Sequence, residues 1–128
     1  MSYYFSKVLS GTFDDARPRV ADALKKEGFG ILMEIDIQAK MKEKLGIDFK
    51  RYMILGACSP PNAYRALQAE ENIGLMLPCN VILYEKDGRV IVSVIRPTVA
   101  MQMIQNEELG KTAREVEDQL KSAFDAMG

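Results

Sequence analysis

Alternating apolar side chains predict most of the strands in this chain. Residues 3–9, 31–37 and 52–58 form runs of strand length that are rich in apolar and β-branched residues. In the second run, every other residue should share one face, namely Ile31, Met33, Ile35 and Ile37. Residues 81–84 and 90–95 predict a hairpin, because Asp87-Gly88 is a strong signal for a two-residue turn. One hairpin face should carry Val81, Leu83, Val90, Val92 and Val94, and the other Ile82, Tyr84, Ile91, Ser93 and Ile95.

Helical spacing predicts the elements between these strands. Thr12, with Asp15 three residues later, predicts a helix start, and Gly28 a left-handed stop. A short helix should end at Gly46, and another should begin at Pro60, followed by a loop through Gly74. The C-terminal helix has apolar residues at helical spacing, namely Leu109, Ala113, Val116, Leu120 and Phe124.

Together these elements predict one α+β domain over residues 1–128. We expect a two-layer sandwich: a mixed, mainly antiparallel sheet of about five strands with helices over one face. The other face should carry Ile54, Ile82, Tyr84, Ile91 and Ile95, with Glu34 and Asp36 nearby. Burial of each large aliphatic side chain stabilises a protein by about 1.5–3 kcal/mol, so an uncovered face is costly. We therefore predict a homodimer whose second subunit covers this face, with a pocket at the seam.

Composition excludes several classes of function. The chain has 128 residues, of which 48% are hydrophobic and 27% charged, as in an ordinary globular protein. Its net charge of −1 gives no electrostatic field that would favour binding to nucleic acid or to an anionic membrane. Histidine is absent, which removes the commonest general base and neutral metal ligand. No run of residues is apolar and long enough to span a bilayer, and the N-terminal residues do not match a secretory signal. We expect a cytoplasmic location, where cysteines normally stay reduced.

The candidate chemistry centres on the two cysteines. Cys58 ends a predicted strand and precedes Ser59, a predicted N-cap, so the helix dipole would lower the pKa of its thiol. Cys79 opens the next strand, and antiparallel pairing would bring both thiols to one edge of the sheet. Three interpretations of the two cysteines remain open: two inert thiols, a redox pair, or half of a metal site. The spacing is not that of a zinc motif, so no metal site is predicted, and no cofactor is assigned.

Other polar residues give weaker signals. Glu34 and Asp36 share a face of one strand. Such a pair could serve acid/base chemistry, bind a hard cation or simply form a solvated surface. Asn62 and Asn80 are candidate pocket residues, as are Tyr64, Tyr84 and Arg96. The segment with Met101, Met103 and Ile104 could form an adaptable apolar wall or pack in the core.

These motifs together resemble a known family. Gly56-Ala57-Cys58-Ser59-Pro60, Leu77-Pro78-Cys79-Asn80 and the Asp87-Gly88 hairpin resemble the DUF302 family of small bacterial and archaeal proteins. The resemblance runs from Gly28-Phe29 to about Pro97. It implies a single α+β domain that forms dimers, with no assigned activity, and points to Cys58, Pro60, Pro78, Cys79 and Asn80 as site residues. The family often has Asn at the position of Ser59 and is expected to have an acidic residue at that of Arg96.

Three hypotheses of function follow from this sequence. The first is a cytoplasmic homodimer that binds a small anionic or thiol-reactive ligand near Cys58 and Cys79, with Ser59, Asn62 and Asn80 as further binding residues. The second is a thiol-dependent redox enzyme, in which Cys58 is the nucleophile and Cys79 the resolving thiol. The third is a structural interaction module whose cysteines belong to the core.

Overall fold

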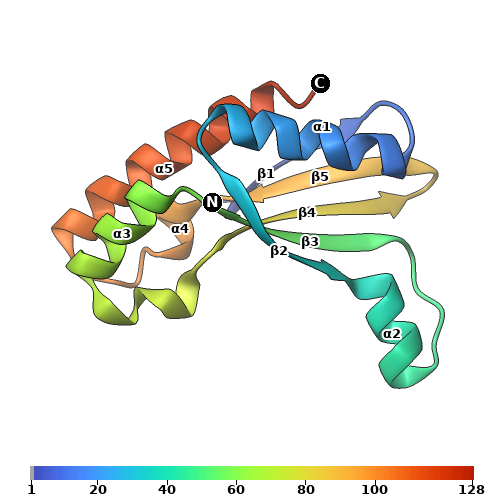
Figure 1. Ribbon diagram of the computed structural model, residues 1–128, viewed down its shortest axis with the longest axis horizontal. Helices are drawn as coiled ribbons and strands as arrows, with labels where there is room; N and C mark the ends of the chain where they lie inside the picture. Colours follow the sequence, from blue (N-terminus) through green and yellow to red (C-terminus); the bar gives the residue numbers. More distant parts are fainter. Residues whose placement is uncertain (1) are drawn as a thin grey trace.

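The predicted elements are present in the order that the sequence pattern indicates. A computed structural model describes residues 2–128 and is shown in Figure 1. Its strands are β1 (Tyr4–Leu9), β2 (Gly30–Asp36), β3 (Tyr52–Cys58), β4 (Cys79–Lys86) and β5 (Arg89–Ile95). Its α-helices are α1 (Phe13–Lys26), α2 (Ile37–Leu45), α3 (Pro60–Ala69), α4 (Pro97–Ala100) and α5 (Glu107–Asp125). The predicted loop through Gly74 is instead a 3-10 helix, η1 (Glu71–Met76).

The five strands form one sheet in the order β1-β5-β4-β3-β2. Each neighbouring pair is antiparallel, so the sheet of residues 2–128 is fully antiparallel and not mixed. The β4–β5 hairpin turns at Asp87 and Gly88, which have φ angles of 52° and 75°. Two consecutive positive φ angles match the twist of the flanking strands, as the Asp-Gly signal predicted.

The core lies between one face of the sheet and the helices. Figure 1 shows α1, α3 and α5 on the same side of the sheet. The strands contribute Val81, Leu83, Val90, Val92 and Val94 to this core, as predicted from the hairpin register. The helices contribute Val20 and Leu24 from α1, and Leu120 and Phe124 from the predicted apolar face of α5. The α+β sandwich with helices over one face is therefore confirmed.

Within residues 2–128, no layer of helices covers the opposite face of the sheet, and we call it the open face. By strand register it comprises Tyr4, Ser6, Val8, Met33, Ile35, Tyr52, Ile54, Gly56, Asn80, Ile82, Tyr84, Lys86, Arg89, Ile91, Ser93 and Ile95. Tyr4, Val8 and Met33 are 42%, 52% and 43% exposed, so large apolar side chains do meet solvent on this face.

The predicted alternation of β2 is wrong at one position. The register shifts between Ile31 and Met33, because Leu32 is an extra residue opposite β3. Ile31 therefore lies on the helix side of the sheet, while Met33 and Ile35 lie on the open face. The shift also turns Glu34 and Asp36 toward the helix side, opposite Leu55 and Met53, instead of toward the open face.

The α2 segment projects from the end of the sheet, away from the other helices (Figure 1). None of its residues is buried. Its ends carry the predicted signals: the side chain of Asp36 accepts a hydrogen bond from the backbone of Ala39, and Gly46 ends the helix with a φ of 66°. Its last residue, Leu45, is 66% exposed, and Ile47 beyond it is 46% exposed.

Gly56 permits a close approach between strands, and this makes a testable prediction. A Cβ atom there would lie 2.7 Å from Cγ of Pro78 and 2.9 Å from Cγ of Met33. We expect Gly56→Ala to lower the free energy of unfolding by about 1–3 kcal/mol, because an inserted methyl group in a packed site forces its neighbours to move. Chemical denaturation measures this change. Gly30→Ala is the matched control, since a Cβ there meets no atom within 4 Å, and equal stabilities of the two variants would contradict the prediction.

Candidate functional site

The structure brings four of the five predicted binding residues to one small cavity. Cys58, Ser59, Asn62 and Cys79 line it, together with apolar side chains from α3, α4 and α5. Antiparallel pairing causes this arrangement, because Ala57 at the end of β3 lies opposite Cys79 at the start of β4. The cavity volume is only about 30 Å³. A buried water needs at least about 10–15 Å³, so the space suits one or two waters and no organic ligand.

Asn62 is held inside the protein by its own hydrogen bonds. It is 4% exposed, and its Nδ2 atom donates to Ser59 Oγ at 3.0 Å and to Gln119 Oε1 at 2.9 Å. Its Oδ1 atom accepts a hydrogen bond from Arg65. Ser59 occupies the predicted N-cap position, but its side chain makes no capping bond to α3. The amide of Asn62 is therefore used to join α3 to α5.

The two thiols have properties opposite to those expected of a nucleophile. Burial raises the pKa of the Cys58 thiol, and burial together with the charge of Cys58 raises the pKa of Cys79 to about 11. The predicted lowering of the Cys58 pKa by the helix dipole is therefore wrong, because desolvation of the thiolate is the cause of the shift. Both cysteines are free, and they do not form the predicted cysteine pair through a disulfide.

Asn80 lies apart from these residues. It pairs with Gly56 and belongs to the open face, whereas its neighbour Cys79 points to the helix side. Successive residues of a strand point to opposite faces, and Asn80 accordingly does not line the small cavity that contains Cys58 and Cys79. Asn80 instead borders two other cavities, one on the open face and one beside η1.

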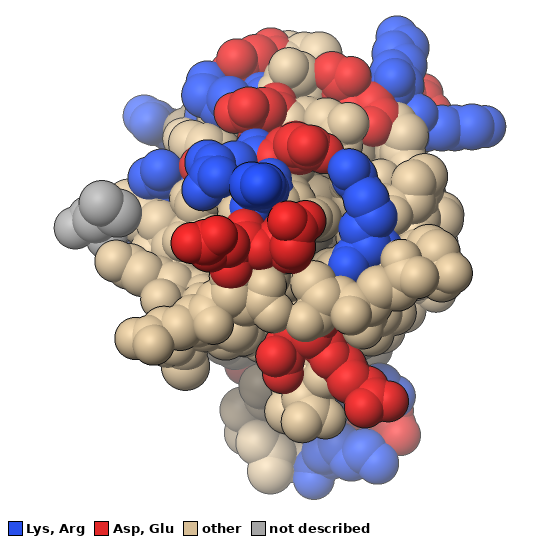
Figure 2. Space-filling model, turned by 90° about the vertical axis from the view of Figure 1, so that its left-hand side faces the viewer, with Lys and Arg blue, Asp and Glu red and all other residues tan. Residues whose placement is uncertain are grey.

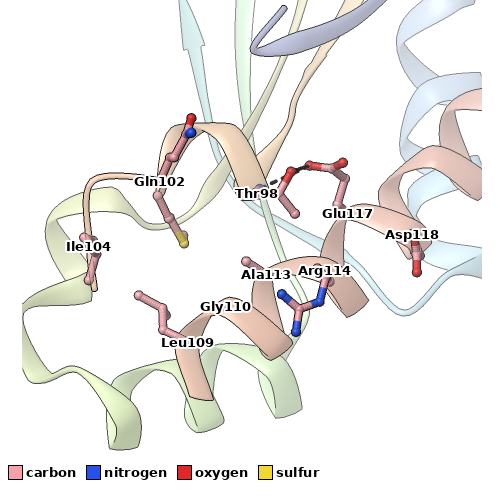
Figure 3. A pocket seen from close by; sticks show the side chains of 10 residues that line it. Thr98, Gln102, Ile104, Leu109, Gly110, Ala113, Arg114, Glu117 and Asp118 are labelled. Atoms are coloured by element: carbon pink, nitrogen blue, oxygen red, sulfur yellow. Dashed lines mark hydrogen bonds between the residues drawn. The ribbon is translucent and has the colours of Figure 1, made fainter. Parts of the chain in front are cut away.

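A much larger cavity lies between α5 and the segment that contains α4, and we call it the α4–α5 groove. Its volume is about 540 Å³, within the range of about 300–1,000 Å³ typical of small-molecule sites. Figure 3 shows Ile104, Leu109 and Ala113 along one part of the groove, and Thr98, Arg114 and Glu117 along another. The groove shares Met101, Leu109 and Ala113 with the small cavity that Cys58 and Cys79 line, which we call the thiol cavity. These three residues therefore separate the two spaces.

Glu117 fixes the shape of this groove. Its Oε1 atom accepts hydrogen bonds from the backbone and hydroxyl of Thr98, at 3.1 and 2.6 Å (Figure 3). Its Oε2 atom accepts from Nε and Nη2 of Arg96, at 3.3 and 3.2 Å. The carboxylate thus connects α5 to the start of α4, and its charge is neutralised by Arg96.

Arg114 differs from the other arginines near the groove. It lies one turn before Glu117 on α5, and its Nη1 atom would be 3.7 Å from a Cβ on Gly110. Within residues 2–128 it takes part in no ion pair. Sequence reasoning missed Arg114 because it resembles any other charge on the solvent side of α5. Only the approach of the α4 segment turns this part of the helix into a cavity wall.

Met101 borders three cavities at once. It lines the thiol cavity, the α4–α5 groove and a third cavity of about 280 Å³ that also contains Pro78, Cys79 and Asn80. Met101 and Ile104 pack against a second core cluster of Ala66, Ile73 and Leu109. Of the two roles left open for this segment, Met101 and Ile104 therefore pack in the core, whereas Met103 is 79% exposed.

Two of the remaining candidates, Glu34 and Asp36, have local structural partners. Glu34 forms an ion pair with Arg17 of α1, which lowers the pKa of the Glu34 carboxyl, and Asp36 caps α2. Tyr64 is 64% exposed on α3. In the described part of the chain, no three Cys, Asp or Glu side chains are arranged to hold a metal ion.

The surface shows no field of a single sign at this end of the molecule. Figure 2 shows acidic and basic side chains interspersed over it. None of the helices within residues 2–128 has the length and apolar character needed to cross a membrane.

Comparison with known proteins gives a family and a fold. Residues 5–127 match the family described as "Domain of unknown function DUF302". The chain is also similar to a solved structure, "Crystal structure of uncharacterized conserved protein DUF302 from Bacillus stearothermophilus". The two share 28% sequence identity with a TM-score of 0.93, and the similarity covers 100% of both chains. No curated protein matches this chain.

The raised thiol pKa values predict slow alkylation. At pH 7 both thiols should react with iodoacetamide more slowly than an ordinary free cysteine, whose pKa is about 8.5, because the thiolate is the nucleophile. Raising the pH should increase the thiolate fraction and hence the rate, with Cys58 ahead of the more deeply buried Cys79. Mass spectrometry of timed samples measures both rates. The urea-unfolded protein provides the control, and faster reaction of native Cys58 than of unfolded Cys58 would contradict the prediction.

Proposed function

We propose a function for this chain from the premise that it belongs to the DUF302 family. The protein is a homodimeric binding domain, and it holds a small anionic ligand in the α4–α5 groove, next to the cavity of Cys58 and Cys79. The observation that carries the proposal is the pairing of an apolar wall with Arg114 in a cavity of about 540 Å³.

The lining of the groove favours a ligand with an apolar body and an anionic end. Met101, Ile104 and Leu109 provide an apolar surface at one end of the groove. Arg114 lies between this surface and Asp118, which Figure 3 places at the end of the groove away from Leu109. The planar guanidinium group can bind a carboxylate or phosphate through two parallel hydrogen bonds.

Glu117 does not oppose an anion here as strongly as its charge suggests. Its carboxylate already accepts hydrogen bonds from Arg96 and from Thr98. Arg114 is consequently the cation that a ligand can use, whereas Arg96 is occupied. This division of roles supports a carboxylate or phosphate ester as the ligand class.

The open face supports the dimer. Its apolar side chains include Val8, Ile54, Ile82 and Ile91, and none of the helices covers them. Exposed Phe49, which follows α2, extends this apolar surface, since its ring lies 6.3 Å from that of Tyr52. A second copy would bury this surface and replace the missing layer.

We also propose a cytoplasmic location. Both cysteines are free, and Cys58 is only partly buried, which suits a reducing compartment.

Arg114→Ala tests the proposed ligand site. We expect octanoate, used as a probe, to bind about 10- to 150-fold more weakly to this variant, because a hydrogen bond to a charged group contributes about 1.5–3 kcal/mol. Isothermal titration calorimetry measures the affinity. Lys111→Ala, which removes a charge elsewhere on α5, is the matched control, and octanol is the uncharged control probe. Equal octanoate affinity in Arg114→Ala and the wild type would refute the site.

Ile91→Asp tests the proposed dimer. Ile91 lies on the open face between β1 and β4, so a carboxylate there should prevent a second copy from docking without disturbing the buried core. Light scattering at micromolar concentration should give a dimer for the wild type and a monomer for the variant. Tyr64→Asp, at an exposed aromatic position on α3, should remain dimeric. A monomeric wild-type protein would end the dimer proposal and leave the ligand site to be judged separately.

A further inference from the structure

The strand positions of the open face, all within the described residues, carry cations and no carboxylate. At its strand positions Lys86 and Arg89 are the charged residues, and none of these positions holds an Asp or Glu. Lys50 precedes β3 and reaches the same face, where its Nζ atom lies 4.9 Å from the centre of the Tyr84 ring. Within residues 2–128, no ion pair involves these three cations.

A second copy of the same face would not supply the missing negative charge. Because a twofold interface brings the same surface from both subunits, it would add the same cations and again no strand carboxylate. Burial of an unpaired ammonium group is expensive, so the two lysines oppose the docking that the apolar residues favour. Some other anion would have to compensate this charge.

A groove on the open face offers a place for that anion. Its volume is about 570 Å³, and Lys50 and Lys86 both line it. Asn80, Tyr52 and Tyr84 add polar groups that can donate hydrogen bonds to an oxyanion. Ser93 is 8% exposed in the groove, and its hydroxyl is 2.8 Å from that of Ser6, so polar groups extend across its floor.

We propose that a small multivalent oxyanion binds Lys50 and Lys86 in this groove and that its binding promotes dimerisation. The inference rests on the dimer of the proposed function, but not on the ligand of the α4–α5 groove. Neutralising the lysines removes their desolvation penalty, so the anion binds the dimer more tightly than the monomer. By thermodynamic linkage, it then stabilises the dimer by the same factor. The shared chemistry is that of a phosphate ester or a polycarboxylate.

Sedimentation equilibrium tests this coupling in the full chain. Inorganic pyrophosphate at millimolar concentration should lower the dissociation constant of the dimer about fivefold or more, the usual lower bound for coupled sites. Sodium chloride at the same ionic strength is the control, because general screening by salt also weakens repulsion between like charges. Citrate in place of pyrophosphate distinguishes a polycarboxylate from a phosphate: a larger effect of one anion assigns the class.

Two variants locate the effect. Lys50→Ala combined with Lys86→Ala should dimerise more tightly than the wild type in chloride and should no longer respond to pyrophosphate. Lys26→Ala, on the helix side in α1, should respond as the wild type does. A dimer that forms equally well in pyrophosphate and chloride would overturn the anion site and leave the dimer standing. A pyrophosphate response that persists in the double variant would overturn the assignment to Lys50 and Lys86. A monomer under every condition would overturn the dimer and this inference together, without bearing on Arg114.

Discussion

The register between β3 and β4 is the constraint on which the rest of the structure depends. It sets Ala57 opposite Cys79 and Gly56 opposite Asn80, and a shift by one residue would exchange the two faces of the sheet. Through this register the apolar side chains of β4 meet the helices, and Cys79 joins Cys58 in the same small cavity. The same register sends Asn80 to the open face. Cys79 therefore lines the small cavity on the helix side and Asn80 lines the groove on the open face, although both also border the cavity beside η1.

A second, smaller core lies beside the α4–α5 groove. Ala66, Ile73 and Leu109 form it, away from the main core under α1 and α5. Because α4 has only four residues, its position depends on contacts with its neighbours, and Glu117 supplies several of them through Arg96 and Thr98. The groove beside Arg114 is the space left between α4 and α5 at this junction. The carboxylate of Glu117 thus fixes one wall of the groove through its hydrogen bonds.

The sequence predicted the elements well because their signals are local. Helix ends at Thr12 and Gly28, the β3 strand and the Asp87-Gly88 turn each depend on a few neighbouring residues. The extra residue at Leu32 could not be predicted, since a bulge is defined only by the partner strand. The candidate site was predicted in part: Cys58 and Cys79 do line one cavity, but its small size and the high thiol pKa values follow from packing. Arg114 gave no signal, because a surface arginine and a groove arginine look the same in a sequence.

The exposed α2 segment shows how unevenly stability is distributed along this chain. None of its nine residues is buried, so the hydrophobic core contributes little to its persistence as a helix. Isolated helices shorter than about 12–15 residues are marginal in water, and α2 relies on the cap at Asp36 and the stop at Gly46. Its backbone amides should therefore exchange with solvent through local opening, independently of global unfolding. In the sandwich beside it, exchange at Val92 or Leu120 requires the whole core to open. The molecule thus combines a sandwich that unfolds cooperatively with a peripheral helix, α2, that folds and unfolds independently of it.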